Sequence, residues 1–318
     1  MNPGIYPDLP EAEYRALDYP SYSSLKRVLT NPHAYRYGSP VAETEAMRWG
    51  KMVDCATLTE HRFYDLYVVG GDWSKEAQDA AEALRGECFD ELYIVSPYEN
   101  FRTNEARKWK EAQLDQHPLA EFVTEARRDE LHQLGTAYNR EVESGRIRIG
   151  VETRDRVWAA SQEILGNPHA RAALEHGHAQ VAMVWEMGGR LVKGLVDWVP
   201  EGHSALVDLK TSVDASPRGY RRQFERFRYD IQAAMYLEGW AQVGLDDRDD
   251  FLHIVQESKS LEVATYRVND EYLERGRRSA LEALEILDRC EHLNEWPGYT
   301  TGWACLLYTS PSPRDGIG

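Results

Sequence analysis

The chain has 318 residues, of which 42% are hydrophobic and 28% are charged, and its formal net charge is −16. This length allows a large core, either as one domain or as one domain with a helical annex, and we favour a single domain. So acidic a chain is a poor candidate for binding nucleic acid over a broad basic surface, although basic residues can still line one channel.

Targeting and cysteine patterns exclude further classes. No apolar run reaches the roughly 20 residues of a membrane-spanning helix, and the N-terminus lacks the basic and apolar regions of a signal peptide. The cysteines, at positions 55, 88, 290 and 305, form no C-x-x-C pair. We therefore expect a cytoplasmic protein without membrane contact, disulfides, zinc or an iron-sulfur cluster.

The N-terminal region predicts an irregular start followed by helices. Residues 1–18 should be irregular, because three prolines interrupt any helix there. Ser21 or Ser23 can cap a helix that ends near residue 30, and the Asn-Pro step at 31–32 starts another. A third helix, at about 43–59, should bury a face that includes Met47 and Val53.

The middle of the chain is the least informative part. Two strand-like runs, LYVV at 66–69 and LYIV at 92–95, flank a charged helix at about 74–85. Residues 105–147 look helical and polar, with breaks at 117–118 and at Gly135. Helices at about 154–165 and from Pro168 then lead to the strand VAMVWE at 181–186.

A hairpin with a carboxylate on each strand follows. Alternation along the first strand, about 190–198, puts Asp197 on one face and Val196 and Trp198 on the other. The second strand, about 204–211, puts Asp208 and Lys210 on one face, and residues 200–202 supply the turn. The hairpin should therefore bring Asp197 close to Asp208 and Lys210.

Two clustered carboxylates repel each other unless a cation lies between them, and hard oxygen ligands suit Mg²⁺ or Mn²⁺ better than zinc. A lysine two residues after Asp208 can orient or activate a water molecule, or stabilise the charge of a phosphoryl transition state. The pattern Asp-x-Lys is short, however. A surface hairpin with a salt bridge is the alternative interpretation.

The segment YDIQAAMYLEGW at 229–240 predicts a helix on which Gln232 and Tyr236 share one face, with Tyr229 beside them. Ordinary helix surface is the alternative. Two strands, at 251–256 and 263–268, and an amphipathic helix at about 270–290 complete the chain. Two basic clusters are either solvated helix faces or nucleic-acid contacts: Arg107, Lys108 and Lys110, and then Arg218, Arg221, Arg222, Arg226 and Arg228.

The order of these motifs resembles the PD-(D/E)xK nuclease superfamily. More closely, VKGLVDW, VDLKTS and YDIQAAMY are similar to the C-terminal nuclease domain of RecE-type exodeoxyribonuclease VIII, which is related to lambda exonuclease. The resemblance implies an α/β fold with a restriction-endonuclease-like core, in which helices flank a central mixed sheet and a helical region precedes it. The nuclease domain would span residues 19–304.

The resemblance also implies roles for residues. Asp197 and Asp208 would bind Mg²⁺, for which Mn²⁺ could substitute, together with the carbonyl of Leu209 and Asp54. Asp54 stands where many relatives have a histidine, and it is either a third acidic ligand or a structural helix residue. Lys210 would act on the water, and Gln232 and Tyr236 would hold the lysine or the DNA end.

The implied activity is exonuclease digestion of linear double-stranded DNA in the 5′ to 3′ direction, in a phage-type recombination system. The implied partners are duplex DNA ends, further copies in a ring-shaped oligomer, and a single-strand annealing protein of the RecT type. A structure-specific endonuclease of the same fold and a catalytically silent DNA-binding or scaffold subunit are the alternatives. Residues 305–315 match a translated sequencing adapter, so we expect residues 305–318 to be a non-native tail. A Ser/Pro-rich disordered tail is the alternative.

Overall fold

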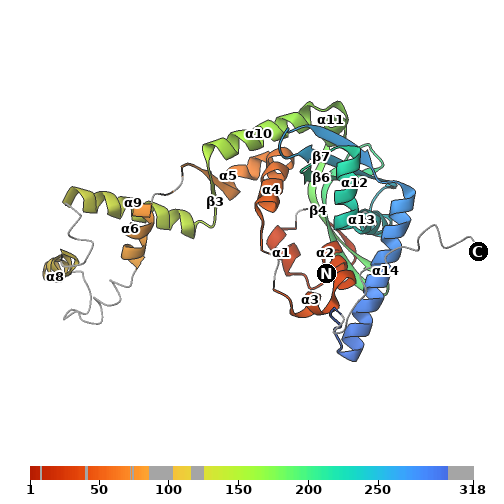
Figure 1. The fold of residues 1–318 in the computed structure, drawn as a ribbon, viewed down its shortest axis with the longest axis horizontal. Helices are drawn as coiled ribbons and strands as arrows, with labels where there is room; N and C mark the ends of the chain where they lie inside the picture. Colours follow the sequence, from red (N-terminus) through yellow and green to blue (C-terminus); the bar gives the residue numbers. More distant parts are fainter. Residues whose placement is uncertain are drawn as a thin grey trace, which may run out of the picture. The chain divides into compact units, whose positions relative to one another are not determined.

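The computed structural model describes residues 1–7, 9–39, 42–71, 73, 75–85, 103–115 and 125–299. The chain forms two compact units (Figure 1). Unit 1 comprises Met1–Thr59 and the chain from Ala159 onward, and unit 2 comprises Glu60–Trp158. The domain limits inferred from the sequence, 19–304, stay a prediction.

Unit 1 is built on a six-stranded mixed sheet with the strand order β1-β4-β5-β6-β7-β8. The strands are β1 (Gly4–Tyr6), β4 (Gly177–Met187), β5 (Arg190–Pro200), β6 (Ala205–Ser212), β7 (Asp250–Glu257) and β8 (Val263–Arg267). Neighbouring strands are antiparallel except for the parallel pair β6 and β7. The crossover that joins this pair contains α12 (Pro217–Phe227) and α13 (Tyr229–Val243), because parallel strands need a long connection.

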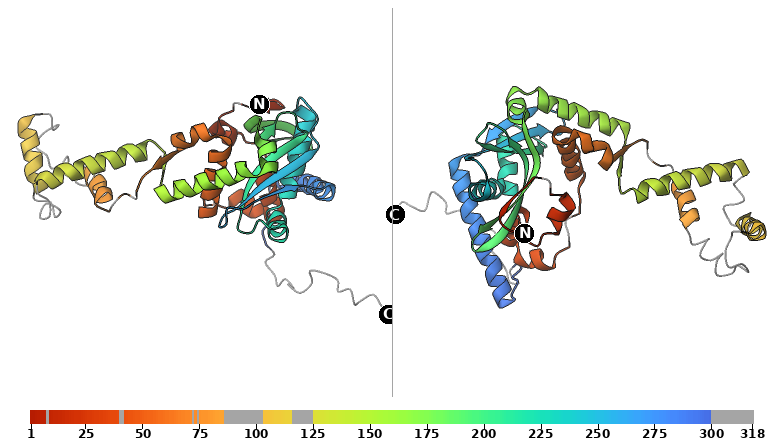
Figure 2. Two further views of the ribbon diagram at one scale, coloured as in Figure 1. Left: turned by 90° about the horizontal axis from the view of Figure 1, so that it is seen from above. Right: turned by 180° about the vertical axis from the view of Figure 1, so that it is seen from behind.

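Helices cover both faces of this sheet (Figures 1 and 2). The larger apolar core joins the sheet to α2 (Tyr22–Thr30), α12, α13 and α14 (Asp270–Leu293), with Trp185 of β4 fully buried in it. A smaller core on the other face contains residues of α4 (Glu45–Leu58), α10 (Val151–Gly166) and α11 (Pro168–Leu174). The predicted mixed sheet flanked by helices is therefore confirmed.

Unit 2 is mainly helical in its described part. It contains a short 3-10 turn (Glu60–Arg62), α5 (Phe63–Leu66), α6 (Lys75–Arg85), α8 (Asn104–Asp115) and α9 (Glu125–Glu143). A two-stranded parallel ladder joins β2 (Tyr67–Val69) to β3 (Ile147–Ile149). The buried ring of Phe63 packs against Tyr67 and Trp158 at centroid distances of 4.8 and 5.2 Å.

The N-terminal segment is ordered by the sheet, so the expectation of an irregular stretch over 1–18 is wrong. β1 pairs with β4, and α1 (Glu11–Ala16) begins directly after Pro10. The prolines do not prevent this structure, because Pro10 occupies the N-cap of α1, where its missing N–H is not needed.

A buried lysine ties this segment to β5. The Lys193 ammonium donates hydrogen bonds to the carbonyl oxygens of Tyr14, Arg15 and Leu17 at 2.9, 3.4 and 2.6 Å. Its backbone N–H donates to the Pro20 carbonyl at 2.9 Å. Lys193 is only 8% exposed, so these carbonyl groups replace water around a buried positive charge.

Several local predictions are confirmed, and others fail. Ser21 caps α2, and Asn31 caps α3 (Pro32–Tyr37), as the sequence predicts. The helix break at Gly135 is wrong, because α9 runs through it, and Met47 is 44% exposed rather than part of a buried face. The run at 92–95, the break at 117–118, the side chain of Lys110 and the tail at 305–318 lie outside the described residues.

α13 and α14 approach each other closely at Gly276. A Cβ atom at this position would lie 2.0 Å from the carbonyl oxygen of Asp230. The Asp230 carboxylate is fully buried and accepts from Arg228 at 3.1 Å and Arg275 at 2.8 Å. The glycine therefore lets the two helices pack around a buried ion-pair cluster.

We expect Gly276→Ala to destabilise the fold by about 1–3 kcal/mol, because the backbone of α13 must move to relieve the contact. Gly166→Ala, at the end of α10, is the matched control, since nothing lies within 4 Å of the added Cβ atom. Urea unfolding should give a lower midpoint for Gly276→Ala and an unchanged or higher one for Gly166→Ala. Equal midpoints would contradict this account of the packing.

Candidate active site

β5 and β6 place Asp197 and Asp208 next to each other. Trp198 is paired with Val207 across the antiparallel ladder, so Asp197 and Asp208 are the next facing positions on the opposite side of the sheet. Asp208 is 1% exposed, and the Asp197 Oδ2 atom accepts a hydrogen bond from the backbone N–H of Leu209 at 3.1 Å. The predicted approach of the two carboxylates is observed.

The alternation of side chains between the two faces of the sheet breaks down on β5 just before Asp197. Val196 belongs to the larger core, whereas Trp198 packs with the smaller core on the other face. On the neighbouring strand, Gln180 has a positive φ of 54° between the ladder pairs Ala179–Trp198 and Val181–Val196. A non-glycine residue rarely adopts this left-handed conformation, and such strain is concentrated at functional sites. The distortion lies beside Asp197.

The turn between the two strands is held by a buried arginine. Nη1 of Arg248 donates to the carbonyl oxygens of Pro200, His203 and Ala205 at 2.8, 2.9 and 2.7 Å. Asp246 accepts from the same guanidinium at 3.0 and 2.9 Å, and the ring of Trp240 lies 4.9 Å from it. These contacts fix the spacing of β5 and β6, and hence that of the two carboxylates.

Lys210 forms an ion pair with Asp208 and lies on the ring of Tyr229, with Nζ 5.0 Å from the ring centroid. Burial by itself lowers the pKa of Lys210, but the charges of Asp208 and Asp197 outweigh it and raise the pKa above its ordinary value. Lys210 is therefore an ammonium ion and a hydrogen-bond donor at neutral pH.

Gln232 reaches the site, and Tyr236 lies elsewhere. Gln232 Nε2 donates to Asp208 Oδ1 at 2.6 Å. The Tyr236 hydroxyl instead accepts from the backbone N–H of Leu195 at 3.4 Å, and its ring lies against Gly194, where a Cβ atom would be 2.7 Å away. Tyr236 is one turn further along α13 than Gln232 and therefore lies over β5. In the described part of the chain, the tyrosine that contacts Lys210 is Tyr229.

Asp54 joins the site from α4. Its Oδ2 atom accepts from Gln180 Nε2 at 3.1 Å, and its Oδ1 atom is buried without a hydrogen-bond partner in the described part of the chain. Burial, followed by the charge of Asp208, raises the pKa of Asp54 to about 7. Burial, Asp208 and Asp54 together raise the pKa of Asp197 well above its usual range. The three carboxylates thus form one electrostatic cluster.

Sequence reasoning did not identify His253 as part of this cluster. His253 of β7 is fully buried and stands beside Asp208 in the parallel ladder. Its Nδ1 atom lies 2.5 Å from the Tyr220 hydroxyl, and burial lowers the pKa of His253 to about 4, so the ring is neutral. The one available signal was a histidine within the apolar run FLHIVQ.

Lys26 of α2 adds a second ammonium group. Its Nζ atom lies 5.1 Å from the ring centroid of Tyr22 and 5.5 Å from that of Phe227. Burial, and then the positive charge of Lys210, lower the pKa of Lys26.

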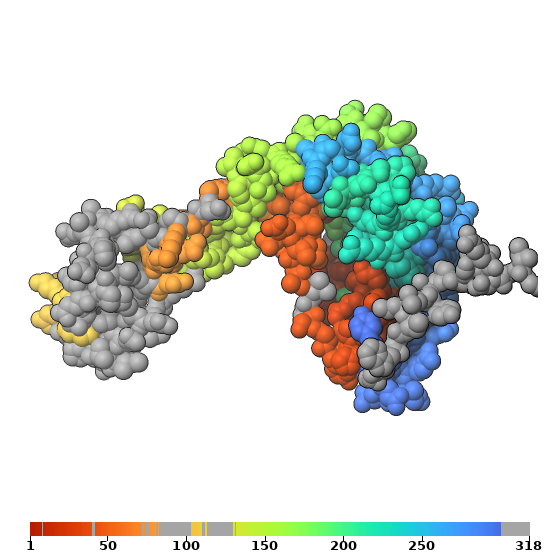
Figure 3. All heavy atoms as spheres, in the orientation of Figure 1, coloured from red at the N-terminus to blue at the C-terminus, as the bar shows by residue number. Residues whose placement is uncertain are grey.

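Figure 3 shows unit 1 hollowed between the orange-red α4 and the teal α12–α13 segment.

The donor chemistry of the acidic cluster fits a hard divalent cation. Asp54, Asp197 and Asp208 supply only oxygen atoms, and Asp54 Oδ1 has no other partner. Within the described residues, no three His, Cys, Asp or Glu side chains are already spaced to hold a metal ion. A bound cation would therefore need further oxygen ligands, such as the Leu209 carbonyl, water or substrate.

Comparison with known proteins agrees with this geometry. The model of a family described as "PDDEXK-like domain of unknown function (DUF3799)" matches residues 139–306, more than half of the chain. The chain belongs to this family. The match includes Asp197, Asp208, Lys210 and Gln232, and it leaves Asp54 outside.

The PDDEXK-like fold is also seen in a solved structure. The crystal structure of a "Putative exonuclease" from Eubacterium rectale has a TM-score of 0.53 and 15% sequence identity, over 98% of this chain and 99% of that chain. The crystal structure of SSO0001 has a TM-score of 0.25 and 15% identity, over 74% of this chain and 85% of that chain. No curated protein matches the sequence. None of the described helices of this PDDEXK-like protein is long and apolar enough to span a membrane.

The raised pKa of Asp54 predicts that this group contributes less to the stability of the metal-free protein as the pH rises. An Asp has a pKa near 3.9 when unfolded and Asp54 has one of about 7 when folded, so between these values the folded state binds more protons. In EDTA, the contribution of Asp54 to the free energy of unfolding should therefore fall from about pH 4 to about pH 7, while that of His253, whose pKa is lowered to about 4, rises over much of the same range.

The difference in free energy of unfolding between wild type and Asp54→Asn should therefore shift against the wild type over this pH range, because only the wild type has the titrating group. Urea titrations at several pH values, each in EDTA, measure the effect. Asp214→Asn is the control, since Asp214 is exposed and its hydrogen bonds with Ser216 lower its pKa instead. The same pH dependence in wild type and Asp54→Asn would contradict the assignment.

Proposed function

We propose that this protein is a Mg²⁺-dependent deoxyribonuclease that hydrolyses phosphodiester bonds, with Mn²⁺ as a possible substitute. The observation that carries the proposal is the contact set around Asp208, which combines an ion pair with Lys210, a hydrogen bond from Gln232 and the charge of Asp197. A surface hairpin with a salt bridge would not bury Asp208 to 1% exposure. PDDEXK-like nucleases generally use divalent metal ions, which agrees with the donor set.

The residues that would hold the cation are Asp197 and Asp208, with the Leu209 carbonyl and Asp54. A bound divalent cation lowers the pKa of a water molecule and neutralises charge on the phosphoryl group. Lys210, as an ammonium ion, donates a hydrogen bond to the attacking water or to a phosphoryl oxygen, where negative charge grows in the transition state. It is not the base that takes the proton.

Gln232 and Tyr236 contribute by position. Gln232 holds one oxygen of Asp208 at 2.6 Å and so orients the other towards Lys210. Tyr236 holds the backbone of β5 at Leu195, two residues before Asp197. We therefore assign Gln232 to the orientation of a carboxylate and Tyr236 to the placement of the strand, rather than to contact with the DNA end.

The finer proposal is exonuclease action from duplex DNA ends in the 5′ to 3′ direction, in a ring-shaped oligomer that works with a RecT-type annealing protein in recombination. The resemblance of the motifs to RecE-type nucleases supports it. The name of the structural neighbour from Eubacterium rectale agrees with exonuclease activity, and at 15% identity that likeness carries the fold alone.

The test uses purified protein with Mg²⁺ on end-labelled linear duplex DNA and on closed circular DNA. We expect digestion of the linear DNA only. Asp208→Asn should lower the rate by at least about a thousandfold while leaving the fold intact, and Lys210→Ala by about a hundredfold or more, because charge stabilisation in the transition state is lost. Glu186→Gln, at the far end of β4, is the control.

Each other outcome has a distinct meaning. Cleavage of closed circular DNA would identify an endonuclease of the same fold. Binding of DNA without cleavage would identify a silent DNA-binding subunit and contradict the proposal. A fully active Lys210→Arg variant would refute the role of a compact ammonium group, because a planar guanidinium has a different shape and donor geometry.

Asp54 gives a separate test of metal binding. If it is a ligand, Asp54→Asn should raise the Mg²⁺ concentration required for half-maximal activity, and Asp54→His should restore part of the activity, more with Mn²⁺ than with Mg²⁺. Cleavage rates measured across a metal titration give both values. Normal metal dependence in both variants would show that Asp54 is a structural helix residue.

A further inference from the structure

The five arginines in and directly after α12 differ in their partners. Arg221 donates to Glu225 at 3.1 Å, and Arg228 donates to Asp230 at 3.1 Å. The other three, Arg218, Arg222 and Arg226, are exposed, and in the described part of the chain none of them forms an ion pair with a carboxylate. Arg222 has a small electrostatic effect on Asp214, whose pKa is lowered mainly by its hydrogen bonds with Ser216.

These three arginines form one stripe. They follow one another at intervals of four residues, so they lie on one side of the helix with a rise of about 6 Å between neighbours. Tyr220 and Phe224, also four apart, are buried on the opposite side. The apolar side anchors α12 in the larger core and leaves the stripe facing solvent.

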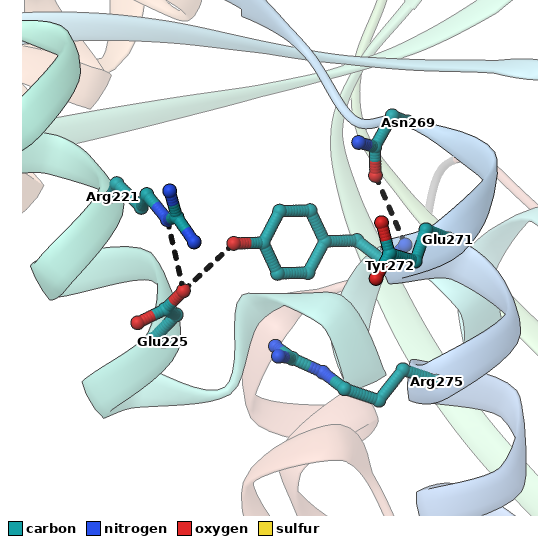
Figure 4. Close-up of a pocket in the computed structure, with 6 residues that line it drawn as sticks. All are labelled: Arg221, Glu225, Asn269, Glu271, Tyr272 and Arg275. Carbon is teal, nitrogen blue, oxygen red and sulfur yellow. Dashed lines mark hydrogen bonds and ion pairs between the residues drawn. The ribbon is translucent and has the colours of Figure 1, made fainter. Parts of the chain in front are cut away.

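The two neighbouring arginines at the pocket beside α12, Arg221 and Arg275, already have carboxylate partners. Figure 4 shows the Glu225 carboxylate between Arg221 and the hydroxyl of Tyr272, which donates to it at 2.8 Å. Arg275, at the same pocket, donates to Asp230 at 2.8 Å. Arg221 and Arg275 at this pocket each have a carboxylate partner, whereas the stripe is a row of positive charge without such partners on a chain of net charge −16.

The stripe leads to the active site through two aromatic rings. The Arg226 guanidinium lies 5.5 Å from the ring centroid of Phe227, whose side chain is 38% exposed. Phe227 stacks on Tyr229 with centroids 5.7 Å apart and an interplanar angle of 27°. Tyr229 is the ring on which Lys210 lies, so one chain of contacts joins Arg226 to the Asp208 cluster.

We propose that Arg218, Arg222 and Arg226 bind the phosphodiester backbone of a DNA strand and lead it to Lys210. The inference rests on the proposed nuclease function and deepens it by naming the surface that holds the substrate. A polyanion is the partner that fits, because a row of evenly spaced guanidinium groups without carboxylate partners is complementary to a row of phosphates. The contacts from Arg226 through Phe227 and Tyr229 join one end of this row to Lys210.

The test measures DNA binding without cleavage. The variant Arg222→Gln/Arg226→Gln is compared with Arg278→Gln/Arg289→Gln, which removes the same charge from exposed positions of α14. Binding of a fluorescein-labelled single-stranded oligonucleotide is followed by anisotropy in EDTA, at a series of KCl concentrations. Urea unfolding of both variants confirms that each is folded.

We expect the stripe variant to bind roughly tenfold more weakly at low salt, and its slope of log Kd against log salt to fall by about 1.4, or about 0.7 for each lost phosphate contact. The α14 variant should match wild type. Arg222→Lys/Arg226→Lys should keep most of the slope, because the charges remain.

Equal slopes for the stripe and α14 variants, or no binding by the wild type in EDTA, would overturn the inference. This failure is distinct from failure of the proposed function. A protein that binds through the stripe but never cleaves would refute nuclease activity alone. A protein that cleaves with an unchanged salt slope in the stripe variant would refute the stripe alone.

Discussion

The burial of negative charge around Asp208 is the constraint on which the rest of the structure depends. Burial, and then the charges of neighbouring carboxylates, raise the pKa values of Asp54 and Asp197. In the described part of the chain, Lys210 alone forms an ion pair with one of the three carboxylates. Removing one member of a buried ion pair typically costs about 3–5 kcal/mol, because the remaining charge has no partner. Such a site is stable only where other contacts of the fold offset this cost and hold the charged groups in place.

Two sets of contacts hold the charged groups in place. Arg248 fixes the turn of the hairpin by donating to three of its backbone carbonyl groups. In addition, α13 packs closely on the sheet because glycines stand at two of its contacts. A Cβ atom on Gly239 would lie 2.7 Å from the ring of Trp185, and one on Gly194 would lie 2.7 Å from Tyr236. Close packing and a braced turn together hold the charges in place.

The sequence predicted the parts of the site that depend on local periodicity. Period-two alternation located both strands, the pairing of a hairpin brought Asp197 close to Asp208, and the spacing of four located a helix bearing Gln232. These features follow from residues close in the chain. The sequence also predicted a mixed sheet between helices, which the structure contains.

The parts that failed depend on tertiary contacts. The hydrogen bond between Gln180 and Asp54 joins residues 126 positions apart, and no local sequence pattern predicts it. Tyr236 has the spacing to accompany Gln232, yet the crossing of α13 over the sheet carries it to β5. β1 exists because β4 offers a free edge, which overrides the proline signal of the N-terminal residues.

The position of Lys193 has a practical consequence for recombinant expression. A shortened protein that starts at residue 19, the limit the sequence suggests for the nuclease domain, would lack Tyr14, Arg15 and Leu17, whose carbonyls surround the ammonium group. It would also uncover the edge of β4, and unpaired strand edges promote association between chains. Removing the first 18 residues would thus lower the solubility of the protein rather than give a smaller soluble domain. For the same reason, an N-terminal affinity tag is better joined through a flexible spacer.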